Sequence, residues 1–529
     1  MNLMLPSARR KDGEKQPCIT VGKFDIRIPF VHYEWEIPEM IQACVVFLTG
    51  TAATQYLQDL FGFTFEMALS IVFVHELLYM VNNTMGDPLI GGWITPAVPL
   101  ITTFLLNFEG TDRMYALVGM ELILGIMYVV LGITGIATKI IDICPQSLKG
   151  GILIGSGFAA CCGTYGFLGE ADGGRGFFTY PISWCIGVAL GLFLLFANGF
   201  GKVKFHSKNR AIKLLTKAGF VPAVIVAGVI GIAIGELDTP DFSDVSSFWF
   251  NPLPGLQWVW DNFSIVGIGI PPAHILLQDL PMAIICYVIA FGDIVGGTAF
   301  MEDTKRYRQD EKIDINPDRT NICCGVRNLI EAFFSPTCTM SGPLWSAMTV
   351  SVAERYKTGK DNMYSIFGGA CTFNMTKWIC QLIVPLVTLV EPILPIAMAM
   401  TLMIQAFGSF YVGINMCRTN VERGVAGITA GAIATCANPA YGLFIGIALA
   451  IIMEYIGMSK KERRANVEEG IEIYLKNTRD ELAEMDDFLA GDVVTVQAQY
   501  GYIGDSQTET RLAAFDAQTG CWEAEIPDA

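Results

Sequence analysis

The chain has 529 residues, of which 52% are hydrophobic and 16% are charged. Soluble domains carry about 25% charged residues, so this composition excludes an ordinary water-soluble globule, and the apolar content excludes a disordered chain. The net charge is −16, and residues 460–529, with 7 basic and 16 acidic side chains, supply more than half of it. No basic stripe is present, so we expect no nucleic-acid partner. The composition indicates a polytopic membrane protein.

The amino-terminal residues 1–36 are polar, carry six basic side chains and contain no apolar signal-like core. We expect this segment to stay in the cytoplasm. The fifteen cysteines lie mostly inside apolar runs and form no CxxC or Cys/His spacing. We interpret them as small residues of the membrane core and predict no disulfide framework, no metal site and no cofactor.

A bilayer core of about 30 Å requires roughly 20 apolar residues per helix. The apolar runs predict an all-α fold with fourteen spans. They are expected at 37–61, 65–84, 89–108, 114–136, 145–167, 179–199, 218–236, 279–301, 321–335, 338–355, 363–390, 391–414, 422–438 and 439–458.

Basic residues concentrate in alternate loops, which predicts that these loops are cytoplasmic. The 201–217 loop holds six Lys or Arg and the 302–320 loop holds five, whereas the 237–278 loop has four Asp and no basic residue. Both termini should then lie inside, in a plasma membrane such as the bacterial inner membrane. The expected organisation is a cytoplasmic segment 1–36, a seven-span repeat 37–236, an external loop 237–278, a second seven-span repeat 279–458 and an acidic cytoplasmic tail 459–529.

Two stretches dense in Gly and Pro interrupt this helical pattern. Residues 86–100 read GDPLIGGWITPAVPL and residues 335–347 read SPTCTMSGPLWSA. Because Pro fits the first turn of a helix, we place helix starts at Thr95-Pro96 and Gly342-Pro343. Interrupted segments at matching places in two halves of a transporter indicate its binding site. They fall in the third and tenth predicted spans, which favours a 7+7 inverted repeat; a pair of ordinary Pro kinks is the alternative.

Ionisable residues inside spans normally face a cavity or a partner, because they are costly in lipid. The predicted spans 1–4 and 8–11 contain all the centrally placed ones, and spans 5–7 and 12–14 contain essentially none. We therefore expect a polar transport core and an apolar gate. The residues concerned are His75, Glu76, Glu121, Asp293, Arg327, Glu331 and Lys377.

These features together resemble the sulfate permease and anion transporter superfamily and, more distantly, the uracil/xanthine permeases. The resemblance covers roughly residues 40–458 and rests on the order and spacing of its motifs. They are the run from Gly292-Asp293 to Thr304-Lys305-Arg306, the segment 325–334 (GVRNLIEAFF), the broken tenth span, Cys144-Pro145 with Gly150-Gly151 and Gly155, and Thr95-Pro96-Ala97.

The resemblance implies an elevator-type transporter whose substrate lies between the facing amino ends of half-helices 3 and 10, each preceded by a short extended stretch. Helix amino ends attract anions without a basic side chain, which agrees with this site. The substrate-binding residues expected on this basis are Gln55, Thr95, Pro96, Ala97, Asp293, Thr339, Met340, Ser341, Gly342, Pro343 and Trp345. The expected coupling residues are Asp293, Glu76 and Lys377, with H⁺ or Na⁺ as coupling ion.

Structural roles remain open for several of these residues. Asp293 either takes part in coupling or caps backbone amides or pairs with Lys377. Glu76 can titrate or join two helices, and Lys377 can compensate substrate charge or snorkel. Trp345 can stack on a planar substrate or fill space between helices, and Gln55 can line the site or pack against a neighbouring helix.

We therefore predict a secondary active transporter for a small anion or polar solute, sulfate-like or a carboxylate, surrounded by lipid and with a homodimer as in the relatives. A nucleobase permease and a non-transporting receptor or scaffold are the alternatives. No Ser/His/Asp arrangement or phosphate-cradling loop indicates an enzyme.

Overall fold

The computed structural model describes residues 5–137, 145–163, 166–168, 176–197, 200, 221–243, 245, 247–417, 419–436, 438–456, 493–500, 507–516 and 521–523. Five helices among them are long and apolar enough to cross a membrane: Ile37–Phe61, Phe65–Thr84, Gly110–Thr134, Ala273–Arg306 and Val384–Met416. Shorter apolar helices accompany them, including Pro181–Leu194 and Val221–Ile234. The chain is therefore a multi-pass integral membrane protein.

The protein buries charged side chains beside its apolar core, and it exposes large apolar residues. Large apolar residues are exposed on the outer faces of helices, for example Ile133 at 63% and Phe444 at 57% exposure, while Arg327 and Glu76 are fully buried. Exposed apolar faces of this extent mark contact with lipid or with a partner. These outer faces are apolar, and several charged side chains lie inside the protein.

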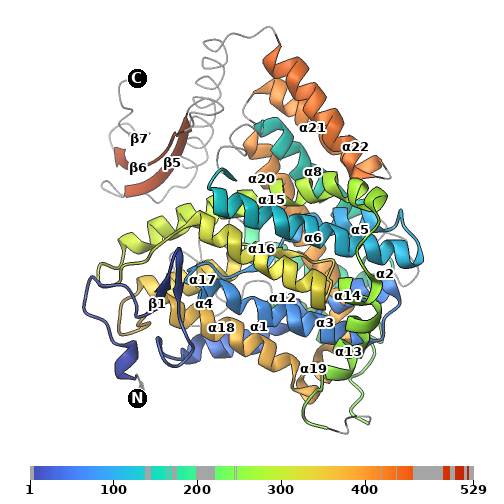
Figure 1. The fold of residues 1–529 in the computed structure, drawn as a ribbon, viewed down its shortest axis with the longest axis horizontal. Helices are drawn as coiled ribbons and strands as arrows, with labels where there is room; N and C mark the ends of the chain where they lie inside the picture. Colours follow the sequence, from blue (N-terminus) through green and yellow to red (C-terminus); the bar gives the residue numbers. More distant parts are fainter. Residues whose placement is uncertain are drawn as a thin grey trace.

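The helices pack in two groups (Figure 1). In the first group α16 packs on α6, α15 packs on α6, and α18 packs on α1 and α3. Its helices are α1 (Ile37–Thr51), α2 (Thr54–Phe61), α3 (Phe65–Leu78), α4 (Met80–Thr84), α5 (Val98–Leu105), α6 (Gly110–Thr134), α13 (Leu253–Asn262), α14 (Ile265–Ile268), α15 (Ala273–Arg306), α16 (Pro317–Phe334), α17 (Ser346–Lys357), α18 (Ile366–Gln381) and α19 (Val384–Val390).

In the second group α8 packs on α20 and α21, and α9 packs on α12. Its elements are α8 (Gln146–Cys162), α9 (Pro181–Phe196), α12 (Val221–Ile234), η3 (Glu391–Ile393), α20 (Leu394–Met416), α21 (Asn420–Thr435), α22 (Pro439–Ala450) and the π-helical turn η4 (Ile451–Tyr455). Figure 1 shows α21 and α22 side by side at one end of the molecule. The first group holds every centrally buried ionisable residue named from the sequence, which is the division that the charge pattern predicts.

The amino-terminal residues 5–36 fold into a cap with η1 (Pro6–Ala8) and a hairpin of β1 (Ile19–Val21) and β2 (Phe24–Ile26). The cap docks on the segment between α15 and α16 and on the first turn of α16: Arg10 pairs with Asp310 at 2.6 Å, and Lys23 pairs with Asp318 of α16 at 3.0 Å. Arg27 is 1% exposed, and its guanidinium lies 3.8 Å from the ring centroid of Phe367. The cap is thus attached to the first helix group.

The carboxyl-terminal strands β5 (Val493–Tyr500), β6 (Gln507–Asp516) and β7 (Cys521–Glu523) form an antiparallel sheet in that order. The basic 201–217 loop lies outside the described residues. Of the acidic tail 459–529, these three strands are the described part.

Three sequence predictions differ from the structure. The tenth-span helix begins at Ser346 rather than at Gly342-Pro343, because Gly342 belongs to β4 (Ser341–Gly342). In the third span, Thr95-Pro96 opens a short 3-10 helix, η2 (Thr95–Ala97), and the α-helix starts at Val98. The 237–278 segment, expected to be a loop, contains α13 and α14, since Val259 and Phe263 are buried apolar residues of the core.

Candidate functional site

The two Gly/Pro-rich stretches meet in the middle of the first helix group. The strand β3 (Gly92–Trp93) pairs antiparallel with β4, with Gly92 opposite Gly342 and Trp93 opposite Ser341. The pairing extends on both sides: the Ile94 amide donates to the Met340 carbonyl at 3.1 Å, and the Trp345 amide donates to the Ile90 carbonyl at 2.7 Å. We call this feature the strand crossing (residues 90–94 and 340–345). Segments about 250 residues apart are thereby joined by backbone hydrogen bonds directly before α5 and α17.

Two consecutive residues of α16 hold the strand crossing from one side. The Arg327 guanidinium donates to the carbonyl of Gly342 at 2.9 Å and to that of Gly92 at 3.3 Å. The Asn328 side chain donates to the Ser341 carbonyl at 2.8 Å and accepts from the Ser341 amide at 3.1 Å. Because irregular backbone inside a membrane protein needs internal partners, these side chains are what allow the helices to break here.

A buried ion pair lies beside the strand crossing. Lys377 of α18 pairs with Glu76 of α3, and both side chains are almost completely buried. The ammonium lies 4.3 Å from the ring centroid of Trp345 and 4.2 Å from that of Tyr79. Both rings offer their faces to the cation, an arrangement that stabilises a positive charge out of water. Gly50 of α1 leaves room for the Glu76 carboxylate, which a Cβ at this position would overlap.

A row of buried polar side chains also connects α3 to α16. His75 Nδ1 lies 2.8 Å from a carboxylate oxygen of Glu331, and His75 Nε2 lies 2.9 Å from the Tyr79 hydroxyl. The same Glu331 oxygen accepts from the Ser341 hydroxyl at 2.6 Å. A further buried carboxylate, that of Glu121, accepts from a backbone amide just ahead of the strand crossing at 2.7 Å. Glu331, His75 and Glu121 therefore lie around the strand crossing, close to Arg327.

Most of the predicted substrate-binding residues lie at this place. Thr339, Met340, Ser341, Gly342, Pro343 and Trp345 belong to the stretch before α17, and Thr95, Pro96 and Ala97 form η2. Met340 has a left-handed backbone, with φ at 36°, which is uncommon for a residue with a side chain. Strained backbone of this kind concentrates at binding and switch regions.

Asp293 lies on α15, one turn before Gly297. A Cβ at Gly297 would lie 3.0 Å from Leu89 and 3.5 Å from Leu344, so this part of α15 packs on the strand crossing. Residues four apart share a helix face. Asp293 is half-buried, and within the described residues it makes no hydrogen bond or ion pair. The alternative in which Asp293 pairs with Lys377 is wrong, because Lys377 binds Glu76 instead.

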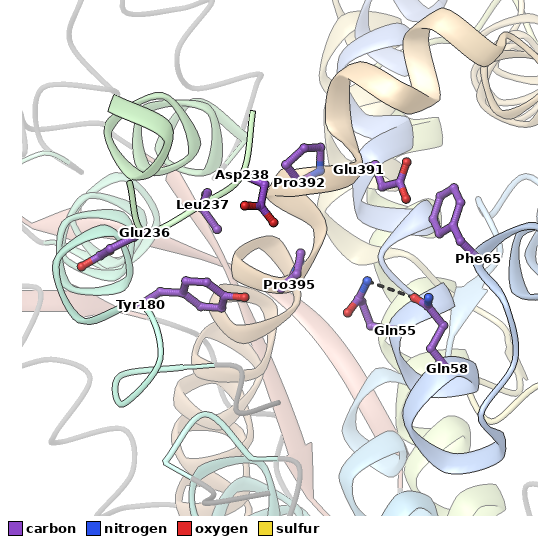
Figure 2. A pocket seen from close by; sticks show the side chains of 10 residues that line it. All are labelled: Gln55, Gln58, Phe65, Tyr180, Glu236, Leu237, Asp238, Glu391, Pro392 and Pro395. Carbon is purple, nitrogen blue, oxygen red and sulfur yellow. Dashed lines mark hydrogen bonds between the residues drawn. The ribbon is translucent and has the colours of Figure 1, made fainter. Parts of the chain in front are cut away.

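Gln55 lies elsewhere, in a cavity of about 240 Å³ (Figure 2). Gln55 donates to Gln58 at 3.2 Å, one turn further along α2. Figure 2 shows these amides on one side of the cavity and Tyr180 and Glu236 on the other. The remaining lining residues are Phe65, Tyr180, Glu236, Leu237, Asp238, Glu391, Pro392 and Pro395. The cavity thus lies where the two groups meet, and its lining contains no other predicted site residue.

The described residues contain no group of three His, Cys, Asp or Glu side chains suited to hold a metal ion. Sequence reasoning noticed Arg327, Glu331 and His75 as charges inside spans but did not assign them to the site. Their position in apolar runs was the signal that could have done so. Tyr79 and Asn328 were missed, because an isolated Tyr or Asn inside a helix has no distinguishing pattern.

Comparisons with known proteins give structural neighbours and no sequence relatives. No protein-family model matches the chain, and no curated protein matches it. The transmembrane domain of the cyanobacterial bicarbonate transporter BicA is 14% identical, with a TM-score of 0.47, over 77% of this chain and 96% of that one.

The murine solute carrier 26 family member A9, an anion transporter in its inward-facing state, is also 14% identical, with a TM-score of 0.46, over 79% of this chain and 68% of that one. A structure of SLC26A9 is 12% identical, with a TM-score of 0.44, over 87% of this chain and 67% of that one.

Proposed function

We propose that the protein is a secondary active transporter that moves a small anion or polar solute, sulfate-like or a carboxylate, across the membrane. The observation that carries this proposal is the pairing of β3 with β4, which brings the amino ends of α5 and α17 to one buried place. The α17 helix has no side-chain cap at its amino end, whereas α5 continues the 3-10 turn η2, with the Val98 amide bonded to the Thr95 carbonyl. Uncapped backbone amides together with the helix dipole attract an anion.

The division into two helix groups supports transport by rigid-body motion. The strand crossing and the Lys377–Glu76 pair belong to the first group, so a displacement of this group against the second would carry a bound solute with its site. The Gln55 cavity lies where the groups meet and supplies space at their boundary. We propose an elevator-type movement on this basis, within a 7+7 repeat.

Asp293 is one of three proposed coupling residues, together with Glu76 and Lys377. Its half-buried carboxylate lies on the face of α15 that packs on the strand crossing, and no described residue neutralises it. A carboxylate in such a place can take up H⁺ or Na⁺, and the arrival of the cation removes a charge that would repel an anionic substrate. Uptake of the cation by Asp293 would thereby be coupled to binding of the anion.

We also propose a plasma-membrane location with both termini cytoplasmic, because the cap and the loop that it binds are rich in Lys and Arg. Assembly as a homodimer is a further proposal, to be tested by cross-linking in the native membrane. Recovery of the protein only at the monomer mass after cross-linking would contradict a homodimer.

The test is uptake by proteoliposomes with and without a pH or Na⁺ gradient. Sulfate and dicarboxylates are compared with uracil and xanthine as competitors. Gradient-driven uptake inhibited by the anions supports the proposal, inhibition by the bases indicates a nucleobase permease, and no flux with any solute indicates a scaffold. Asp293→Asn should weaken the effect of the gradient without loss of folded protein, and unchanged gradient dependence would refute the role of Asp293.

A further inference from the structure

The Lys377–Glu76 pair lies directly beside the amino end of α17. Trp345 is the residue before that helix, and its ring is in contact with the Lys377 ammonium at 4.3 Å. A full positive charge therefore adjoins the end of a helix whose own dipole is positive there. An anion held by α17 would be within reach of both.

This pair has unused hydrogen-bonding capacity. Lys377 and Glu76 touch, but neither the ammonium nor either carboxylate oxygen makes a contact with hydrogen-bond geometry to the described residues. Gln381, one turn further along α18, also has a buried side-chain oxygen without a partner. An ammonium has three donors and a carboxylate has about four acceptor sites, and buried polar groups are nearly always satisfied. A cluster of this kind is suited to a small polar guest.

The other charged groups that face the pair are already committed. Arg327, which stacks on Tyr79 at 4.6 Å, donates to the carbonyls of the strand crossing. On α16, Glu331 binds His75 and the Ser341 hydroxyl, and His75 is the remaining titratable group of α3 beside Glu76. The charge of Lys377 is therefore balanced by Glu76.

We propose that the transported anion binds Lys377 by displacing Glu76, and that it does so after Glu76 has taken up a proton. This inference rests on the proposed function and specifies the ligand and the coupling step. The ion pair is neutral, so an added anion would leave an uncompensated buried negative charge, which is costly. When a proton from the solution neutralises Glu76, the ammonium and the anion form a neutral pair in turn.

Charge balance also selects the substrate class. Once Glu76 is neutral, the Lys377 ammonium carries one positive charge, which a monovalent anion balances, whereas a divalent anion would leave one buried negative charge uncompensated in the pair. The acceptor oxygens of a small oxyanion can take the three donors of Lys377. The site would therefore carry a small monovalent oxyanion together with one proton, and the proton leaves Glu76 on the opposite side as the ion pair re-forms.

The experiment measures uptake of nitrate and formate by proteoliposomes, with sulfate as the divalent comparator. All three keep their charge between about pH 6 and 8, so a pH effect belongs to the protein. In the wild type, an inward proton gradient should drive uptake, and KM should rise with pH. Glu76→Gln imitates the protonated acid, and it should retain uptake with a KM that no longer depends on pH.

Lys377→Gln should raise KM by about tenfold or more at every pH, since it removes the charge that holds the anion. Because that change leaves Glu76 buried without a partner, the double variant Glu76→Gln/Lys377→Gln is measured beside it. Lys305→Gln is the matched control: this lysine is also paired with a glutamate, Glu302, but both are exposed on the last turns of α15. It should leave KM unchanged.

The outcomes separate the inference from the proposed function. Wild-type affinity in the double variant, or an unchanged pH profile in Glu76→Gln, overturns the role of the pair while transport stands. Uptake of sulfate without nitrate or formate overturns the monovalent class. Absence of flux for all three anions overturns anion transport itself.

Discussion

Replacing Gly342 by Ala should push β4 away from β3 in the strand crossing. A Cβ at this position would lie 2.9 Å from the backbone amide nitrogen of Ile94 and from the backbone carbonyl of Trp93. These are atoms of the paired strand and cannot rotate away as a side chain could. Overpacking of this kind costs about 1–3 kcal/mol, and each ladder hydrogen bond lost adds about 1 kcal/mol. We expect a lower unfolding midpoint and, because small displacements of a binding site are costly, uptake reduced by about tenfold or more.

Gly427→Ala is the matched control for this experiment. Gly427 lies in α21, and a Cβ there has nothing within 4 Å. In a helix interior Ala is favoured over Gly by about 0.5–1 kcal/mol, so the same substitution should raise the midpoint slightly and leave uptake unchanged. Thermal unfolding of both variants in detergent, followed by proteoliposome uptake, gives the comparison. If Gly342→Ala matches Gly427→Ala in both measurements, the strand crossing does not set the geometry of the site.

Three other predictions test the surroundings. Arg327→Lys should lower the free energy of unfolding by about 2 kcal/mol, because an ammonium cannot replace a planar guanidinium that reaches two carbonyl groups. An unchanged unfolding midpoint in detergent would contradict this. Gly50→Ala should displace the flexible Glu76 carboxylate from its lysine partner and weaken the pH dependence of nitrate uptake, and a wild-type pH profile would speak against that contact. Hydrogen bonds from Arg308 hold the pKa of Asp310 at about 2, below its ordinary value, so the ionised carboxylate stabilises the fold above about pH 4 and this contribution is lost as the pH falls toward 2. Asp310→Asn should therefore lower the midpoint at neutral pH, with a difference from the wild type that narrows on acidification; a difference independent of pH would refute the assignment.

Local physics made the helices predictable. An apolar run long enough for the bilayer has to be helical, because lipid offers no partners to the backbone. The span expected at 114–136 corresponds to α6 (Gly110–Thr134), and the one at 391–414 corresponds to α20 (Leu394–Met416). The Gly- and Pro-rich interruptions were equally predictable, because these residues disfavour helix interiors wherever they occur.

The start of the tenth-span helix was misplaced for a physical reason. The preference of Pro for the first turn of a helix says only where a helix can accept Pro343. The position of Gly342 is set instead by its strand partner and by Arg327. Both are distant in sequence, so local preference could not reveal them. Tertiary hydrogen bonds keep the chain extended as far as Trp345, and the helix begins where they end.

The sequence by itself determined that this is a multi-pass membrane protein, where its polar interior lies and which two segments are interrupted, because bilayer thickness and the cost of buried charge act on each segment separately. The tertiary structure alone decided which charges meet: Lys377 binds Glu76 and not Asp293, and Arg327 is bound to backbone carbonyls. Such pairings depend on the rotation and depth of helices that are far apart in the chain, and packing of the whole first helix group fixes them.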